Sequence, residues 1–232
     1  LLSTIHKEVR SRSNKSNIAT KKKMKILNLY AGIGGNRKLW GNEHQITAIE
    51  YDKDIAAIYK DFFPDDEVLV EDAHDYLLNH FKEYDFIWSS PPCPTHSQIR
   101  YNIGFKANRK YKKVEAVYPD LALYQEIILL QYWFDGKYVI ENTIPYYEPL
   151  IAGRKMAKHI WWTNIHCSDI EIKSRGHRGG TVESLSKLKG FDLSKYKIKD
   201  KRKILRNCVE PEIGLHFLKS LNNKQQEELF NE

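Results

Sequence analysis

The sequence lacks the features that mark membrane, secreted or disulfide-rich proteins. In 232 residues, no apolar run approaches the roughly 20 residues that a membrane-spanning helix needs. The N-terminal segment has no apolar core of the length found in secretory signals. The three cysteines, Cys93, Cys167 and Cys208, do not have the spacing of a disulfide framework. We therefore expect a water-soluble protein of a reducing, cytoplasmic compartment, with no membrane partner.

The excess positive charge lies at one end of the chain. The net charge is +7, and residues 1–25 contain eight Lys or Arg and one acid, which leaves 29 bases and 29 acids in the remainder. Residues 1–23 are also rich in Ser and Asn, so we expect a disordered basic tail. Contact with nucleic acid and a merely solvated extension both explain this tail. The overall charge therefore does not identify a ligand.

A second basic segment lies inside the chain. Residues 100–113 contain six Lys or Arg, no acid, and the aromatic residues Tyr101, Phe105 and Tyr111. Gly104 and the scattered Asn residues favour a loop. Such a loop could bind phosphates and stack on bases. A solvated surface loop has the same composition, so both interpretations stay open.

From Met24 onward, short apolar runs alternate with amphipathic segments. The expected strands are residues 25–30, 45–51, 68–71, 85–89, 137–141 and 160–166. The expected helices are a short one after residue 35, then 52–63, 76–81, 121–134 with Pro119 in its first turn, and one that begins at Pro211. Strands separated by helices imply parallel βαβ units. We predict an α/β fold with a mostly parallel, doubly wound sheet, as one domain over residues 24–232.

A glycine-rich turn joins the first strand to the first helix. It reads Tyr30-Ala31-Gly32-Ile33-Gly34-Gly35, and glycines there let a ligand approach the carboxyl edge of the sheet. Glu50 ends the second strand, where an acid can accept hydrogen bonds from the ribose hydroxyls of a nucleoside. The two features predict a nucleoside-containing cofactor. The spacing leaves S-adenosylmethionine and a nicotinamide dinucleotide open, and the lack of a G-x-G-x-x-G run disfavours the dinucleotide.

A cysteine framed by prolines follows the fourth strand, in the segment Ser89–Ser97. Two consecutive prolines make the approach to Cys93 rigid and leave it at the ligand-binding edge of the sheet. The basic segment that follows could supply the electropositive surroundings that a nucleophilic thiolate needs. A buried structural cysteine is the alternative. Cys93 and His96 also form a C-x-x-H pair, but no second pair completes a zinc site, so we predict no metal.

An acid ends the fifth strand, in Glu141-Asn142-Thr143. Right-handed crossovers bring the fourth and fifth strands beside the first, so Glu141 is expected to face Cys93 across a pocket. A thiolate that adds to carbon 6 of cytosine makes carbon 5 nucleophilic, and a carboxyl group at ring nitrogen 3 stabilises the accumulating charge. Without Cys93, a capping or surface acid would be the better interpretation of Glu141.

In this order, the motifs resemble those of the DNA cytosine-5 methyltransferase family. Tyr30–Gly35 resembles its F-A-G-x-G-G cofactor turn, Pro91-Pro92-Cys93 its P-P-C nucleophile motif, Glu141-Asn142 its E-N-V motif, and Arg206–Val209 its closing G-N-x-V motif. The resemblance implies that the cofactor is S-adenosylmethionine. The cofactor-binding residues that it implies are Tyr30, Gly32, Gly34, Gly35, Glu50, Tyr51, Asp72, Ala73, Pro91 and Asn207.

Three departures from the family pattern bear on function. Arg206 stands where the family usually has Gly. The family's Q-x-R-x-R motif has no clear equivalent, and Arg154, Lys155 and Lys158 are the nearest candidates, with Lys158 expected to be catalytic. Only about 35 residues separate the strand predicted at 160–166 from the closing motif, so the target-recognition insert, near residues 166–200, is expected to be very small. Its candidate base-reading side chains are Arg175, His177 and Arg178.

The resemblance implies a Rossmann-like class I methyltransferase fold and methyl transfer to carbon 5 of cytosine in double-stranded DNA. It implies Cys93, Glu141 and Lys158 as catalytic residues, and the restriction–modification setting of a bacterium or phage. Methylation of cytosine in RNA is one alternative, and a subunit that needs a partner chain for target recognition is another. A nicotinamide oxidoreductase and an amino-methylating enzyme are disfavoured, because neither accounts for Cys93 after the two prolines.

Overall fold

Seven strands form one sheet in the computed structural model, which describes residues 23–99, 101, 116–171 and 180–221. The strands are β1 (Lys25–Leu29), β2 (Gln45–Ile49), β3 (Glu67–Leu69), β4 (Phe86–Ser89), β5 (Lys137–Thr143), β6 (Arg154–Met156) and β7 (His159–Thr163). The helices are α1 (Lys53–Phe62), α2 (Ala73–His80), α4 (Ala122–Trp133), α5 (Val182–Lys189), α6 (Lys201–Asn207) and α7 (Pro211–Ser220), with short 3-10 turns η1 (Asn36–Leu39) and η2 (Phe81–Glu83).

The sheet is mixed but mostly parallel. Its strand order is β3-β2-β1-β4-β5-β7-β6, with β1 to β5 parallel and β7 antiparallel to both of its neighbours. The chain builds the sheet outward from β1 in one direction and then from β4 in the other. Doubly wound sheets bind ligands in the crevice at the carboxyl ends of the two strands where the direction changes. The predicted α/β, doubly wound fold is confirmed.

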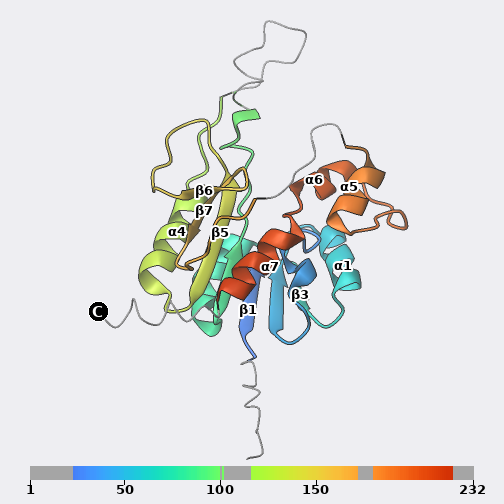
Figure 1. Cartoon of the computed structure of the whole chain (residues 1–232), viewed down its shortest axis with the longest axis horizontal. Coiled ribbons are helices and arrows are strands. Elements are labelled where there is room, and N and C mark those ends of the chain that lie inside the picture. Colours follow the sequence, from blue (N-terminus) through green and yellow to red (C-terminus); the bar gives the residue numbers. More distant parts are fainter. Residues whose placement is uncertain (1–22, 100, 102–115, 172–179, 222–232) are drawn as a thin grey trace, which may run out of the picture.

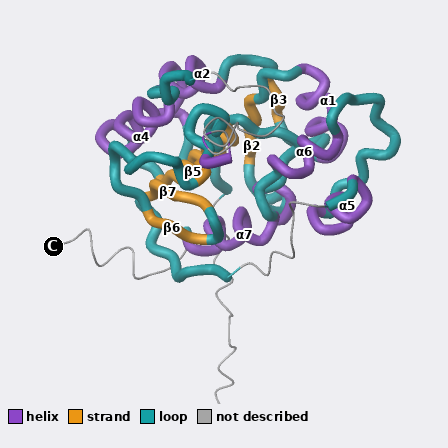
Figure 2. The backbone as a smooth tube through the Cα atoms, turned by 90° about the horizontal axis from the view of Figure 1, so that it is seen from above, coloured by secondary structure: helices purple, strands orange, loops and turns teal. Residues whose placement is uncertain are grey.

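Helices cover both faces of this sheet, with α2 and α4 on one side and α7 on the other (Figures 1 and 2). Alternate residues of a strand point to opposite faces, so the central strands must be apolar throughout. In β4, Phe86 and Trp88 pack with Phe217 of α7, whereas Ile87 packs with Ile127 of α4. This double burial explains why these strands are continuous apolar runs in the sequence.

Most predicted elements occur within a few residues of their expected bounds. The Asp52 carboxylate caps α1 by accepting hydrogen bonds from the backbone N–H groups of Asp54 and Ile55, and the helix ends before Pro64 as predicted. The prediction that Pro119 lies in the first turn of α4 is wrong, because the helix begins at Ala122, whose N–H is bound by the Asp120 side chain.

The strand predicted at 160–166 extends further than the observed strand β7. β7 stops at Thr163, three residues before the predicted end at His166. The Asn164 side chain then takes over the pairing with β5, since it accepts from Tyr138 N–H and donates to the Gly136 carbonyl. β6, α5 and α6 were not predicted.

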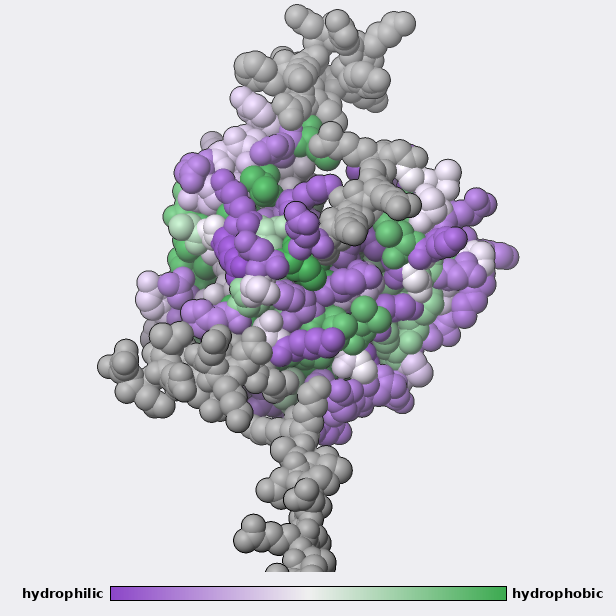
Figure 3. Space-filling model, in the orientation of Figure 1, coloured by the Kyte–Doolittle hydropathy of each residue, from purple (hydrophilic) through white to green (hydrophobic). Residues whose placement is uncertain are grey.

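A third region of the core surrounds α1. Leu185 of α5, Leu205 of α6, and Phe191 between them pack with Ile58 and Tyr59 of α1. The described part of the expected recognition insert therefore includes residues that are buried in this core. On the face drawn in Figure 3, hydrophilic side chains predominate around small apolar groups. No helix in the described ranges is long and apolar enough to cross a membrane.

We predict that Gly214→Ala destabilises the fold by at least about 2 kcal/mol, because overpacking a tight contact forces the backbone to move. A Cβ atom at Gly214 of α7 would lie 2.0 Å from the backbone carbonyl oxygen of Asn36 in η1. Urea denaturation measures the change in the free energy of unfolding. The exposed Lys219 of the same helix is the control, and Lys219→Ala should change stability by less than about 0.5 kcal/mol.

Candidate functional site

The glycine turn leaves β1 in a conformation that few residues adopt. Tyr30, Gly32 and Gly34 all have positive φ, at 53°, 54° and 83°, and this lets the chain reverse directly above the sheet. The Gly32 N–H donates to the Glu50 carboxylate over 2.9 Å, and the Asp52 N–H donates to its other oxygen over 3.0 Å. The end of β2 thereby holds the turn in position. Burial raises the pKa of Glu50, while these backbone bonds oppose that rise.

The turn lies directly against the closing motif. A Cβ atom at Gly35 would lie 2.4 Å from both the Cys208 sulfur and the Val209 carbonyl oxygen. Glycine at position 35 therefore permits the segment after α6 to pack on the segment after β1. Motifs more than 170 residues apart in sequence form one wall here.

An open cavity of about 760 Å³ lies beside this wall. Five of the ten residues predicted to bind the cofactor line this cavity. They are Tyr30, Gly32, Gly35, Glu50 and Asn207. The other side of the cavity is formed by residues 197–200 together with Lys203 and Ile204. These last residues were not identified from the sequence, because no motif marks them.

The remaining residues predicted for the cofactor lie around this cavity or beyond it. Gly34 packs on the rings of Tyr59 and Phe63, where a Cβ atom would clash. Tyr51 is 77% exposed after β2. Asp72 caps α2 through one carboxylate oxygen, Ala73 is buried in the core, and Pro91 lines the neighbouring cavity.

Residues at the ends of β4 and β5 hold the segment that contains Cys93. The Asn142 side chain donates to the Pro91 carbonyl over 3.1 Å, and the Ser90 hydroxyl donates to the Glu141 carboxylate over 3.0 Å. The Cys93 carbonyl then accepts from the backbone N–H groups of His96 and Ser97, which closes a turn around Cys93.

His96 is buried and anchors this turn rather than pairing with Cys93. Its Nδ1 lies 2.5 Å from the Tyr147 hydroxyl, and its carbonyl oxygen accepts from the Tyr146 N–H. Within residues 23–99, 101, 116–171 and 180–221, no three Cys, His, Asp or Glu residues are grouped as metal ligands. Tyr101, the one described residue of the basic 100–113 segment, stacks on Tyr146 at 4.8 Å.

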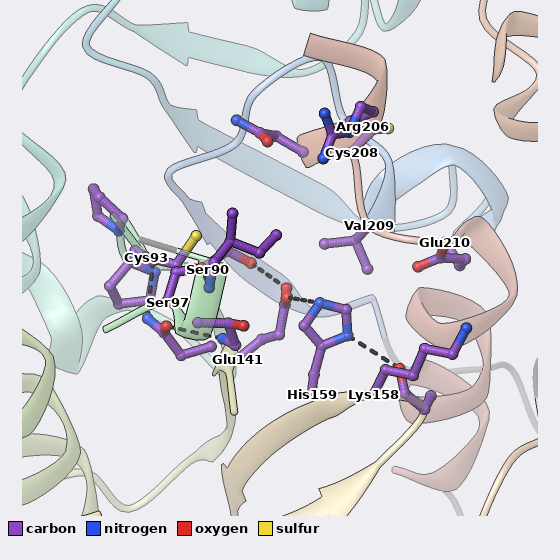
Figure 4. A pocket seen from close by; sticks show the side chains of 17 residues that line it. Ser90, Cys93, Ser97, Glu141, Lys158, His159, Arg206, Cys208, Val209 and Glu210 are labelled. Carbon is purple, nitrogen blue, oxygen red and sulfur yellow. Dashed lines mark hydrogen bonds and ion pairs between the residues drawn. The ribbon is translucent and has the colours of Figure 1, made fainter. Parts of the chain in front are cut away.

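A second cavity, of about 350 Å³, lies on the other side of Cys93 (Figure 4). It brings together Cys93, Glu141 of β5, Lys158, His159 of β7 and Arg206 of α6. The predicted catalytic residues Cys93, Glu141 and Lys158 thus line one space. Cys93 also lines the larger cavity, so a group bound in either cavity would be adjacent to its sulfur.

The Cys93 thiol is held in its protonated form. Cys93 is exposed on the surface, but surrounding protein atoms desolvate its sulfur, and this, with the negative charge of Glu141, raises its pKa. Only the thiolate is a strong nucleophile. The cationic side chains of Lys158 and Arg206 lie around the same cavity, and Arg206 occupies the position of the usual glycine.

His159 is the pocket residue that sequence reasoning missed. Its Nε2 lies 3.4 Å from Glu141 Oε1. A signal was available, because His159 directly follows Lys158 and directly precedes the strand predicted at 160–166. Arg154 and Lys155, the other candidates for the missing arginine motif, lie elsewhere. Arg154 bonds to Asp169 and to the Cys167 carbonyl, and Lys155 is exposed on β6.

Tyr30, which replaces the usual phenylalanine, has a partner for its hydroxyl. It donates to Oε1 of the fully buried Glu126 over 2.6 Å, and Ser89 donates to Oε2 over 2.7 Å. His74 lies 3.1 Å from the same carboxylate, and this contact raises the pKa of His74. The contact between charged His74 and Glu126 therefore stabilises the fold fully below about pH 6.5, the pKa of an unfolded histidine. This contribution is lost as the pH rises through the raised pKa of His74.

Several predicted features lie outside the described residues. These are residues 1–22 of the basic tail, nearly all of the 100–113 segment, and the candidate base readers Arg175, His177 and Arg178.

One protein family model matches the N-terminal part of the chain. Residues 24–118 match the model of the C-5 cytosine-specific DNA methylase family. The matched range contains the glycine turn, Glu50, Asp72 and Cys93, whereas Glu141, His159 and the closing motif lie beyond it. A search of curated proteins found no match.

Solved structures with similar folds include several methyltransferases. A hypothetical protein of Thermus thermophilus matches with 14% identity and a TM-score of 0.41, over 61% of this chain and 74% of that one. A DNMT2 mutant of Spodoptera frugiperda matches with 24% identity and a TM-score of 0.34, over 51% of this chain and 35% of that one. A SAM-dependent methyltransferase of Agrobacterium tumefaciens matches with 14% identity and a TM-score of 0.38, over 58% and 42%. The chain spans less than half of the last two proteins.

The raised pKa of Cys93 predicts slow alkylation near neutral pH. Because the thiolate fraction grows as pH rises, the rate with iodoacetamide should keep rising above the pH of about 8.5 at which an ordinary cysteine is half ionised. Glu141→Gln removes a negative charge, so it should move that rise to lower pH. Mass spectrometry of the Cys93 peptide measures the rate, and the Cys167 peptide in the same digest serves as the control. An unchanged Cys93 profile in Glu141→Gln would contradict this account.

Tyr30→Phe should destabilise the fold by about 1–3 kcal/mol, because the buried Glu126 carboxylate loses one of its donors. Urea denaturation measures the change in the free energy of unfolding. Tyr132→Phe removes a hydroxyl from an exposed position of α4 and should have almost no effect. Equal stability of wild type and Tyr30→Phe would mean that the Glu126 carboxylate does not depend on this bond.

Proposed function

We propose that this chain, whose residues 24–118 match the model of the C-5 cytosine-specific DNA methylase family, methylates carbon 5 of cytosine in DNA with Cys93 as the nucleophile. One observation carries the proposal: Cys93 lines two cavities, one with Glu141 and one with the glycine turn and Glu50. A methyl transfer between two bound molecules requires such a junction, because donor and acceptor must meet at one point.

The larger cavity suits S-adenosylmethionine, which supplies the methyl group when bound. Each oxygen of the Glu50 carboxylate accepts one backbone N–H, from Gly32 or Asp52, and a carboxylate oxygen has a second lone pair for a ribose hydroxyl. The positive φ of Gly32 and Gly34 lets the backbone approach a ligand closely. Asp72 and Ala73 at the start of α2, with Tyr51 after β2, are proposed for the adenine side.

The smaller cavity suits an extruded cytosine. Base chemistry on a duplex requires the base to leave the stack. There the Cys93 thiolate would form a bond to carbon 6, while Glu141 would give a proton or hydrogen bond to ring nitrogen 3. Carbon 5 would then take the methyl group, and loss of the carbon 5 proton would release Cys93. Lys158 and Arg206 would stabilise the thiolate or a nearby phosphate.

The proposal treats residues 24–232 as one catalytic domain. The described residues of the 166–200 range pack largely on the cofactor side, so these residues offer few side chains for reading a target. We therefore propose a short DNA target for the isolated chain, with residues 1–23 contributing only sequence-independent attraction to phosphates.

Covalent catalysis predicts a trapped complex with DNA that contains 5-fluorocytosine. Fluorine at carbon 5 cannot leave as a proton does, so wild type with S-adenosylmethionine should form an adduct that survives denaturing electrophoresis. Cys93→Ser should lose the adduct and lower methyl transfer by at least about a hundredfold. Transfer of a labelled methyl group to duplex DNA measures turnover.

Cys167→Ser is the matched control, because Cys167 lies after β7 and lines neither of the two cavities. It should keep both the adduct and turnover. Parallel assays on RNA separate the substrates, and methylation of RNA alone would overturn the DNA assignment. Normal turnover in Cys93→Ser would overturn the mechanism. Cofactor binding with turnover restored by cell extract would indicate a partner chain for recognition.

A further inference from the structure

We infer that His159 holds and returns the proton that Glu141 presents to the base, as a positioning residue that acts through that carboxyl group. The inference rests on the proposed cytosine chemistry and adds a residue to it. It starts from the position of His159, the first residue of β7, which is paired with Thr143 at the end of β5. This pairing brings its ring to the cavity that contains Cys93 and Glu141 (Figure 4).

A strained turn orients the imidazole ring. Ala157 and Lys158 join β6 to β7, and both have positive φ, at 50° and 67°. Two positive φ values suit a two-residue hairpin turn, but each costs about 1 kcal/mol in a residue other than glycine. The turn directs the Ala157 carbonyl oxygen at His159 Nδ1, at 3.1 Å. A carbonyl oxygen only accepts, so Nδ1 must carry a hydrogen.

That assignment fixes the proton count between His159 and Glu141. With Nδ1 protonated, the ring at Nε2 is either a bare acceptor or, in the charged form, an N–H donor. Nε2 lies 3.4 Å from Glu141 Oε1, so the attractive states are a neutral ring facing a carboxylic acid and a charged ring facing a carboxylate. Both states hold one proton between the two groups.

The other carboxyl oxygen has a separate partner. Glu141 Oε2 accepts from the Ser90 hydroxyl, which in turn accepts from Trp88 Nε1 over 2.9 Å. The Glu141 carboxyl group is therefore held from β4 at one oxygen and faces His159 with the other.

Further charged groups lie near His159. Glu210 lies close enough to His159 for the two charges to interact, and the buried Lys189, 2.9 Å from Glu210 Oε1, is the larger cause of the lowered pKa of that glutamate. Among the described residues, the titratable or charged groups that share the cavity with His159 are Glu141, Glu210, Cys93, Cys208, Lys158 and Arg206.

The proton completes the proposed reaction. When the Cys93 thiolate bonds to carbon 6, the electron pair of the conjugated ring moves to nitrogen 3, which takes the proton from Glu141. That proton is the one the pair stores: the imidazolium of His159 gives its Nε2 proton to the Glu141 carboxylate, which passes it to nitrogen 3, so that a neutral ring and an ionised carboxylate remain. When Cys93 leaves, nitrogen 3 gives its proton back to Glu141, and the pair regains its starting charge.

Two variants separate proton storage from simple positioning. His159→Gln keeps an N–H that can contact Glu141, whereas His159→Ala removes it. If His159 stores a proton, both variants should lower kcat about ten- to a hundredfold, with KM for S-adenosylmethionine unchanged. A carboxyl group alone loses its proton near pH 4, and an imidazole loses its proton near about pH 6.5. In both variants, the fall in kcat at high pH should therefore begin at a lower pH than in wild type.

His80→Gln is the matched control, because His80 forms a histidine–glutamate pair with Glu83 on the surface, and it should retain wild-type kcat. Rescue of kcat and of its pH profile by His159→Gln would overturn proton storage and leave only a positioning contact.

Nitrogen NMR of the wild-type His159 ring provides a test that needs no turnover. A ring protonated at Nδ1, whether neutral or charged, supports the inference, and a neutral ring protonated only at Nε2 overturns it. Absence of methylation by wild type would instead overturn the proposed function.

Discussion

The parallel register of β4 and β5 is the constraint on which the pocket depends. It aligns Ser89 with Ile140, so the residues that follow, Ser90 and Pro91, meet Glu141 and Asn142. The bonds from Ser90 to Glu141 and from Asn142 to Pro91 continue this alignment past the last backbone pair. Because side chains alternate between the faces of a strand, a slip of one residue would turn Glu141 away from Cys93.

The antiparallel part of the sheet adds residues from the opposite direction. Because β7 runs against β5, its first residue lies at the carboxyl edge where the parallel strands end. A third contribution comes from the chain after α6, which packs against the glycine turn at Gly35. Lys189 of α5 reinforces this segment by binding the Cys208 carbonyl and Glu210. The two cavities are thus bounded by parallel strands, one antiparallel hairpin and one C-terminal segment.

Local patterns in the sequence were sufficient for much of the fold and for part of the site. The central strands were recognisable because burial on both faces makes them largely apolar. Helix α1 was recognisable because Asp52 and Pro64 mark its ends. Cys93 and Glu141 were found because each follows or ends a strand whose neighbour is set by the handedness of crossovers. β6, α5 and α6 escaped prediction because they are short. The buried residues in α5 and α6 are few, so their stability comes mainly from packing on α1.

The sequence by itself therefore determined the order of the elements, the doubly wound topology and the motifs at the strand ends, since each of these depends on residues close together in the chain. Only the tertiary structure decided that the Tyr30 hydroxyl serves Glu126, 96 residues away, and that Cys93 borders two cavities. It also decided that His159, and not Arg154, faces Glu141. Such contacts depend on strand register and on a turn with positive φ, and neither is encoded in the periodicity of a single segment.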